Sequence, residues 1–240
     1  MFKAIWLAFL LPLAASCWAE NEDEAARERL LNRIEQDFRD TAAMTGKRAL
    51  DPRVKKALRE VPRHLFVDPP HRHQAYKNRP LPIGYGQTIS QPYIVALMTA
   101  LLEPQPDHTV LEIGTGSGYQ AAVLSRLVKK VYTVEIIEPL AEQARKRLRE
   151  LGYANVEVRL GDGYHGWKEH APFDGIVVTA AASHIPQPLV QQLKPGGRMI
   201  VPVGGHFLTQ SLLLVEKDRG GRVITRQLLP VRFVPLTGKH

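Results

Sequence analysis

The chain has 240 residues, of which 44% are hydrophobic, and its formal net charge is +8. This length supports one domain with a full hydrophobic core. The single cysteine, Cys17, excludes an internal disulfide bond and a cysteine-based metal site. Positive charge can attract nucleic acid, but acidic residues are interspersed among the basic ones and no basic run alternates with aromatic residues. We therefore expect solvated helix faces and no nucleic-acid partner.

Residues 1–19 are typical of a secretory signal. A short apolar stretch follows Lys3, and a small-x-small cleavage site ends at Ala19. The stretch is too short for a stable membrane-spanning helix, so no stable membrane insertion is expected. Lipid attachment at Cys17 is a second interpretation, although the residues before it fit a lipoprotein signal poorly. The rest of the chain, residues 20–240, is predicted to form one domain.

The first part of this domain, residues 20–103, is predicted to be mainly helical. Residues 63–79 are predicted to be irregular, and we expect His71 and His73 there to lie on a surface loop, because no third metal ligand stands at a recognised spacing. The glycines and prolines of residues 80–92 predict a shaped loop. The helices are predicted at Glu22–Met44, from Asp51-Pro52 to about Glu60, and at Pro92–Leu102.

The second part, residues 104–240, alternates short apolar runs with amphipathic segments. Such alternation is typical of an α/β fold with a doubly wound, mostly parallel sheet. A turn around residues 218–221 predicts a C-terminal antiparallel hairpin at one edge. The predicted strands are Val110–Ile113, Lys130–Glu135, Val156–Leu160, Phe173–Thr179, Arg198–Val203, Thr209–Glu216 and Arg222–Val234, with helices after Gly118, from Pro139 to Gly152 and at Gln187–Leu193.

A glycine-rich turn follows the first of these strands. Gly114, Gly116 and Gly118 precede an apolar-periodic helix, so the backbone can approach a ligand closely and the helix N-terminus can attract an anion. The dinucleotide fingerprint requires a small residue at position 119, where this chain has Tyr119. The Gly-x-Gly-x-Gly spacing, preceded by Glu112, resembles the first motif of class I S-adenosylmethionine-dependent methyltransferases.

Two acidic residues end or follow the next strands. Glu135 ends its strand at the carboxyl edge of the sheet, where a carboxylate can accept both hydroxyls of a ribose. Asp162 and the Gly163 N–H follow the third strand and could contact an adenine edge. A turn aspartate between glycines is the alternative for Asp162. Together with the glycine turn, these acids indicate a cofactor that carries a nucleoside.

Several segments resemble the protein-L-isoaspartate O-methyltransferase family. The resemblance covers roughly Arg27 to Thr237, and the Gln-Thr-Ile-Ser-Gln-Pro loop is specific to that family. The segments are Val61–Val67, Gly86–Pro92, Leu111–Gln120, Gly161–Gly163, Ala171–Gly175, Leu193–Gly197 and Arg232–Leu236.

The resemblance implies methyl transfer from S-adenosylmethionine to the free α-carboxylate of isoaspartyl residues in proteins and peptides. It places Ser90 between cofactor and substrate as the catalytic residue, with no metal. The alternative role of Ser90 is to cap the helix that begins at Pro92, although Gln91 occupies the cap position if Pro92 is the first helical residue. The expected cofactor-binding residues are Gln87, Thr88, Glu112, Gly114, Thr115, Gly116, Glu135, Asp162, Gly163 and Thr237.

Other interpretations remain open from the sequence. The chain could methylate another substrate, or it could be a basic protein that uses the fold for binding alone. A monomer is expected. The family resemblance and the supply of S-adenosylmethionine favour the cytoplasm, whereas residues 1–19 favour export to the periplasm.

Overall fold

The computed structural model describes residues 11–205 and 208–238, with side chains from residue 22 onward. Residues 1–10 of the signal-like segment lie outside this description, while residues 11–19 belong to the first helix. In the N-terminal part, the elements are α1 (Leu11–Asp40), α2 (Ala42–Thr45), α3 (Pro52–Glu60), the 3-10 helices η1 (Arg63–Phe66) and η2 (Pro69–Gln74), β1 (Leu81–Gly84), β2 (Gln87–Ile89) and α4 (Pro92–Leu102).

The second part is the predicted alternation of strands and helices. Its strands lie close to the predicted ranges, although β7 begins five residues earlier than expected, at Leu193 instead of Arg198. Its elements are β3 (Thr109–Ile113), α5 (Tyr119–Ser125), β4 (Lys130–Glu135), α6 (Glu138–Glu150), β5 (Val156–Leu160), η3 (Gly163–His165), η4 (Lys168–His170), β6 (Phe173–Val178), α7 (Gln187–Gln192), β7 (Leu193–Val203), β8 (Gln210–Lys217) and β9 (Val223–Val231).

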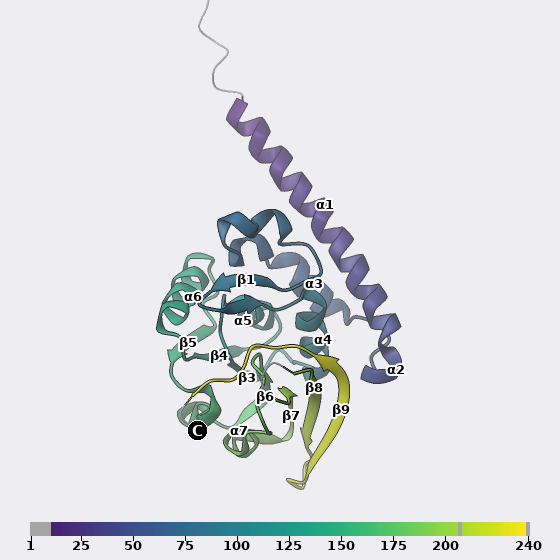
Figure 1. Ribbon diagram of the computed structural model, residues 1–240, viewed down its shortest axis with the longest axis vertical. Coiled ribbons are helices and arrows are strands. Elements are labelled where there is room, and N and C mark those ends of the chain that lie inside the picture. Colours follow the sequence, from purple (N-terminus) through teal and green to yellow (C-terminus); the bar gives the residue numbers. More distant parts are fainter. Residues whose placement is uncertain (1–10, 206–207, 239–240) are drawn as a thin grey trace, which may run out of the picture.

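The main sheet has seven strands in the order β5-β4-β3-β6-β7-β8-β9 (Figure 1). Strands β5 to β7 pair in parallel, and β8 and β9 add the predicted antiparallel hairpin at one edge. The predicted fold class is therefore confirmed. The chain order reverses between β3 and β6, so a crevice for ligands is expected at the carboxyl ends of these two strands.

The central strands of the sheet are buried on both faces. Successive β3 residues point to opposite sides, so Val110 packs into the cluster that contains α4 and α5 while Leu111 packs into the cluster that contains Leu189 of α7. Near-continuous apolar runs in β3, β4 and β6 follow from this two-sided burial. No helix within the described ranges has the length and hydropathy needed to cross a membrane.

Helix α1 passes along one side of the domain, against α3 and α4 (Figure 1). It starts at Leu11, earlier than the predicted Glu22, and ends at Asp40 instead of Met44. At its end, the Thr41 hydroxyl donates to the Asp37 carbonyl (2.8 Å), a local bond that competes with helix continuation. A short separate helix, α2, then takes the place of the last predicted turn.

The prediction of a loop at residues 80–92 is partly wrong, because residues 81–89 form the antiparallel hairpin β1–β2. Leu81, Ile83 and Ile89 are buried and tie the hairpin to the core, whereas Tyr85 at its tip is exposed. Pro82 and the two glycines of the tip obscure the alternation of apolar and polar residues that would have identified the strands. The hairpin carries Gln87 and Thr88 toward the main sheet.

Arg63 connects the two segments that flank this hairpin. Its side chain is completely buried, Nε donates to the Ala75 carbonyl (2.9 Å) and Nη2 donates to the Ser90 carbonyl (2.8 Å). The guanidinium also lies over the Tyr119 ring, 4.9 Å from its centroid. Burial lowers the pKa of Arg63 to about 10 and raises that of Tyr119 to about 12. One cation therefore joins the residues before the hairpin, the residue after it and helix α5.

Replacing Arg63 with Met should destabilise the fold by about 2–4 kcal/mol, because two buried carbonyls lose their donors. Urea unfolding measures this loss. Arg126→Met is the control, since Arg126 stacks on Tyr153 (5.0 Å) but is exposed and should cost about 1 kcal/mol or less. Equal losses in the two variants would show that the carbonyl bonds contribute nothing.

Candidate functional site

The glycine turn after β3 has the close backbone approach that the sequence predicts. Gly114 has a φ of 93°, and a Cβ there would lie 2.5 Å from Oγ1 of Thr179. Thr179 follows β6, and its hydroxyl donates to the Gly114 carbonyl (2.7 Å) across the switch point of the sheet. The turn is thus fixed to the neighbouring strand by a residue to which the sequence assigned no role beyond ending that strand.

Glu135 lies directly against this turn. Its Oε2 accepts from the Gly116 N–H (2.8 Å) and its Oε1 accepts from the Ile137 N–H (3.0 Å). Each oxygen keeps a further lone pair, so the carboxylate can still accept ligand hydroxyls. Glu135 therefore shapes the turn as well as offering a contact to a ligand.

Glu112 is fully buried on β3, the strand next to that of Glu135. Its Oε2 accepts from the Thr133 hydroxyl (2.6 Å), which in turn accepts from the Thr115 hydroxyl (2.7 Å). Its Oε1 has no partner within the described part of the chain. Burial raises the pKa of Glu112 to about 8, the Thr133 bond opposes this shift, and the charge of Glu135 adds to it. A buried carboxyl oxygen without a partner is a candidate ligand contact.

Asp162 and Gly163 have different roles: Asp162 stabilises a turn, and Gly163 lines a crevice. The Asp162 carboxylate accepts from the Tyr164 N–H (3.0 Å), which is the turn role considered as its alternative. Gly163 lines the crevice next to Glu135 and sits so close to Ile113 that a side chain there would collide with it. The structure thus places Gly163 at the crevice wall, while a ligand contact of Asp162 stays a prediction.

Two narrow crevices lie over the carboxyl ends of β3, β4 and β6. The first, of about 60 Å³, and the second, of about 30 Å³, meet at the glycine turn. The first is lined by the predicted residues Gln87, Thr88, Gly114, Gly116, Glu135, Gly163 and Thr237. The second is lined by the predicted residues Thr88, Ser90, Glu112, Gly114, Thr115 and Gly116.

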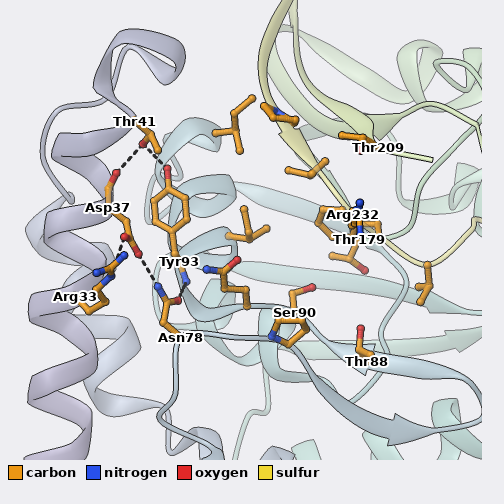
Figure 2. Close-up of a pocket in the computed structure, with 18 residues that line it drawn as sticks. Arg33, Asp37, Thr41, Asn78, Thr88, Ser90, Tyr93, Thr179, Thr209 and Arg232 are labelled. Atoms are coloured by element: carbon orange, nitrogen blue, oxygen red, sulfur yellow. Dashed lines mark hydrogen bonds and ion pairs between the residues drawn. The ribbon is translucent and has the colours of Figure 1, made fainter. Parts of the chain in front are cut away.

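A large, open cavity of about 650 Å³ adjoins these crevices (Figure 2). Thr88 and Thr179 line all three spaces, and Ser90 lines the large cavity and the second crevice. The segment Leu229–Val234, which includes Arg232, also lines this cavity. A ligand in the crevices and a larger ligand in the cavity would therefore meet at the end of the β1–β2 hairpin.

Helix α1 supplies the far wall of the large cavity. Arg33 and Asp37 form an ion pair (3.0 Å), and Asp37 also accepts from the Asn78 side chain. Asn78 accepts from the Tyr93 N–H (3.0 Å) at the start of α4 (Figure 2). No sequence pattern indicates this network, because its members come from three separate segments and have ordinary surface residue types.

Ser90 does not cap helix α4. Pro92 is the first helical residue and Gln91 occupies the cap position, as the sequence predicts. Within residues 11–205 and 208–238, the Ser90 hydroxyl forms no hydrogen bond, while its carbonyl is held by Arg63. The hydroxyl is therefore available to a ligand at the junction of the spaces.

His71 and His73 lie on η2, and within the described ranges no group of three or more His, Cys, Asp or Glu side chains is arranged to hold a metal ion.

Glu112→Gln should change how stability depends on pH. Because the folded pKa of Glu112 is about 8 and its ordinary value is 4.5, the protonated form stabilises the fold below pH 4.5, and this contribution is lost as pH rises through about 8. The variant carries no such titration, so its free energy of unfolding should increase relative to the wild type over this range. Urea titrations at several pH values measure the difference, and parallel profiles would contradict the assigned shift.

Comparison with known proteins identifies the family of this chain. A family model described as protein-L-isoaspartate(D-aspartate) O-methyltransferase (PCMT) matches residues 42–240. Protein-L-isoaspartate O-methyltransferase 2 of Syntrophobacter fumaroxidans is 63% identical over 240 residues, which cover 99% of this chain and 97% of that protein. Protein-L-isoaspartate O-methyltransferase 1 of Cupriavidus necator is 59% identical over 98% of this chain and 92% of its own. A solved protein-L-isoaspartate O-methyltransferase structure matches with a TM-score of 0.75 and 31% identity, over 88% of this chain and 66% of that one. The chain belongs to the protein-L-isoaspartate O-methyltransferase family.

Proposed function

We propose that this protein transfers a methyl group from S-adenosylmethionine to the free α-carboxylate of L-isoaspartyl residues in damaged proteins. The ester then closes to a succinimide, whose hydrolysis returns part of the chain to normal aspartate. Family membership supports this activity. The observation that carries it is the meeting of two crevices and one large, open cavity at Thr88 and Thr179, with Ser90 between the cavity and the second crevice, since methyl transfer requires two different ligands to touch at one point.

The residues around the crevices suit S-adenosylmethionine, which supplies a methyl group on a positively charged sulfur. Glu135 would accept from the ribose hydroxyls, and the unpartnered Glu112 Oε1 would accept from a cationic group. Asp162 would contact the adenine edge, and the glycine turn would lie against the cofactor. The remaining binding residues would be Gln87, Thr88, Thr115, Gly163 and Thr237.

The first crevice, at about 60 Å³, is smaller than the roughly 300 Å³ or more of ordinary small-molecule sites. Gln87 and Thr88 of the β1–β2 hairpin form one part of its wall and residues 234–237 form another, so one of these two segments would move as the cofactor enters.

Catalysis requires positioning more than proton transfer. A carboxylate is already a nucleophile, and it needs no general base to attack a methyl group. The negative charge of the acceptor and the positive charge of the sulfur disappear together, so holding the two in line away from water gives most of the acceleration. Ser90 would orient the substrate carboxylate by donating a hydrogen bond, without forming a covalent intermediate.

Ser90→Ala should lower the methylation rate by about ten- to a thousandfold, equivalent to a barrier higher by about 1.4–4 kcal/mol. Cofactor affinity and melting temperature should change little, because the Ser90 hydroxyl makes no hydrogen bond in the described part of the protein. Turnover of an isoaspartyl peptide and thermal unfolding are measured on the same preparation. Full turnover in the folded variant would refute the proposed role.

Glu135→Ala and Gly116→Val should each weaken binding of S-adenosylhomocysteine, as measured by calorimetry. The first removes two charge-assisted hydrogen bonds to the ribose, each worth about 1.5–3 kcal/mol. The second places a side chain on a wall shared by both crevices, where a Cβ would lie 3.3 Å from Cδ1 of Ile83. Undiminished affinity in folded variants would be incompatible with this cofactor site.

We place the reaction in the cytoplasm, where S-adenosylmethionine is made, and expect a monomer without a nucleic-acid partner. Residues 20–240 would act as one domain, with 20–103 as its helical part and 104–240 as the cofactor-binding core. The signal-like residues 1–19 support the alternative of export. Cell fractionation with N-terminal sequencing separates the two, and a mature periplasmic chain that begins near Glu20 would overturn the cytoplasmic assignment.

A further inference from the structure

A second open cavity, of about 430 Å³, lies between α1 and the segment that contains η2. We call it the basic groove, because its lining includes the basic residues Arg29, Arg33, Arg72, His73 and Lys77. Arg33 and Asn78 line both this groove and the large cavity, so the two spaces are neighbours across these side chains. The groove therefore extends the substrate side of the site along α1.

The charge of this groove is largely uncompensated. Asp23 is the one carboxylate among its described lining residues, and it lies 3.3 Å from His64. Arg33 is paired with Asp37, but Arg29, Arg72 and Lys77 are exposed and form no ion pair within the described ranges.

The field of these cations reaches neighbouring groups. Burial lowers the pKa of His64, Asp23 opposes this shift, and the positive charges of Arg27 and Arg72 add to it. Burial likewise lowers the pKa of Arg147, where Asp68 opposes the shift and Arg72 adds to it. Cations that repel protonation of their neighbours also attract anions to the same surface.

Scattered surface cations usually contact only water. Here the basic residues line one groove, which shares Arg33 and Asn78 with the large cavity. A substrate polypeptide carries several residues on each side of its isoaspartyl residue, and these must leave the large cavity in some direction. A flank that crosses the side chains of Arg33 and Asn78, which both spaces share, would enter the basic groove. Carboxylates on that flank would find Arg29, Arg72 and Lys77 without partners.

We propose that the basic groove binds acidic side chains on one flank of the isoaspartyl residue and gives the enzyme a preference for acidic substrate segments. This inference rests on the proposed function and adds a specificity determinant to it. Each ion pair between the groove and a substrate carboxylate would be exposed and therefore weak. Three such pairs together would lower KM by about tenfold. Their effect should fall with added salt, since the Debye length is about 8 Å at physiological ionic strength.

The test uses four isoaspartyl peptides, with three Glu or three Gln residues placed on the N-terminal or the C-terminal side. For the wild-type protein, KM should be about tenfold lower for Glu than for Gln on one of the two sides, with similar kcat. The Arg29→Gln, Arg72→Gln, Lys77→Gln triple variant should lose this difference by raising KM for the Glu peptide. A matched control replaces three exposed cations elsewhere with Gln. They are Arg149 on α6, Lys168 on η4 and Arg219 in the β8–β9 turn. This control should keep the preference.

Equal KM values for Glu and Gln on both sides would overturn the proposal, and this is also what a groove for nucleic acid or an anionic membrane predicts. The same holds if the triple variant raises KM equally for Glu and Gln peptides, because the groove would then act through the fold. Methylation of the Gln peptides shows separately that the proposed function holds. If no isoaspartyl peptide is methylated, the proposed function and this preference both fail.

Discussion

The buried guanidinium of Arg63 is the interaction on which the site geometry depends. A charge without solvent is costly, and here two carbonyls and an aromatic face offset part of that cost, while Nη1 has no hydrogen-bond partner among the described residues. The two carbonyls belong to Ala75 and Ser90, and the ring to Tyr119 at the start of α5. The substrate side of the hairpin and the helix that follows the glycine turn are thereby fixed relative to one cation. A loss of this cation would free the hairpin end from the turn.

Fixed geometry matters more here than any reactive group. Methyl transfer to a carboxylate needs no activated nucleophile, so the protein accelerates it by holding two ligands in line. Thr179 closes the same arrangement from the other side, because its hydroxyl joins the carboxyl ends of β6 and β3 through the Gly114 carbonyl. The glycine turn and the neighbouring strand are thereby held together at the point where the cavities meet.

The parts that the sequence predicts are those with strong local signals. Apolar runs between glycine and proline residues identify the parallel strands, and Pro92 fixes the start of α4, which leaves Ser90 outside the helix. The β1–β2 hairpin is missed because its strands have four and three residues and contain Pro82. The roles of Arg63, Asn78 and Thr179 arise only from tertiary contacts, since each joins residues far apart in the chain.

Helix α1 shows how one segment can serve the core and the substrate surface together. Leu30, Leu31, Ile34 and Phe38 are buried along one face, as a helical repeat requires. Positions 29, 33 and 37 follow one another at four-residue spacing on a different face, where they line the basic groove and the large cavity. The core fixes the helix, so the spacing of the charged residues is fixed as well. All these residues precede position 42, where the match to the family model begins. The basic groove thus combines α1 residues from before position 42 with Arg72 and Lys77 from the matched region.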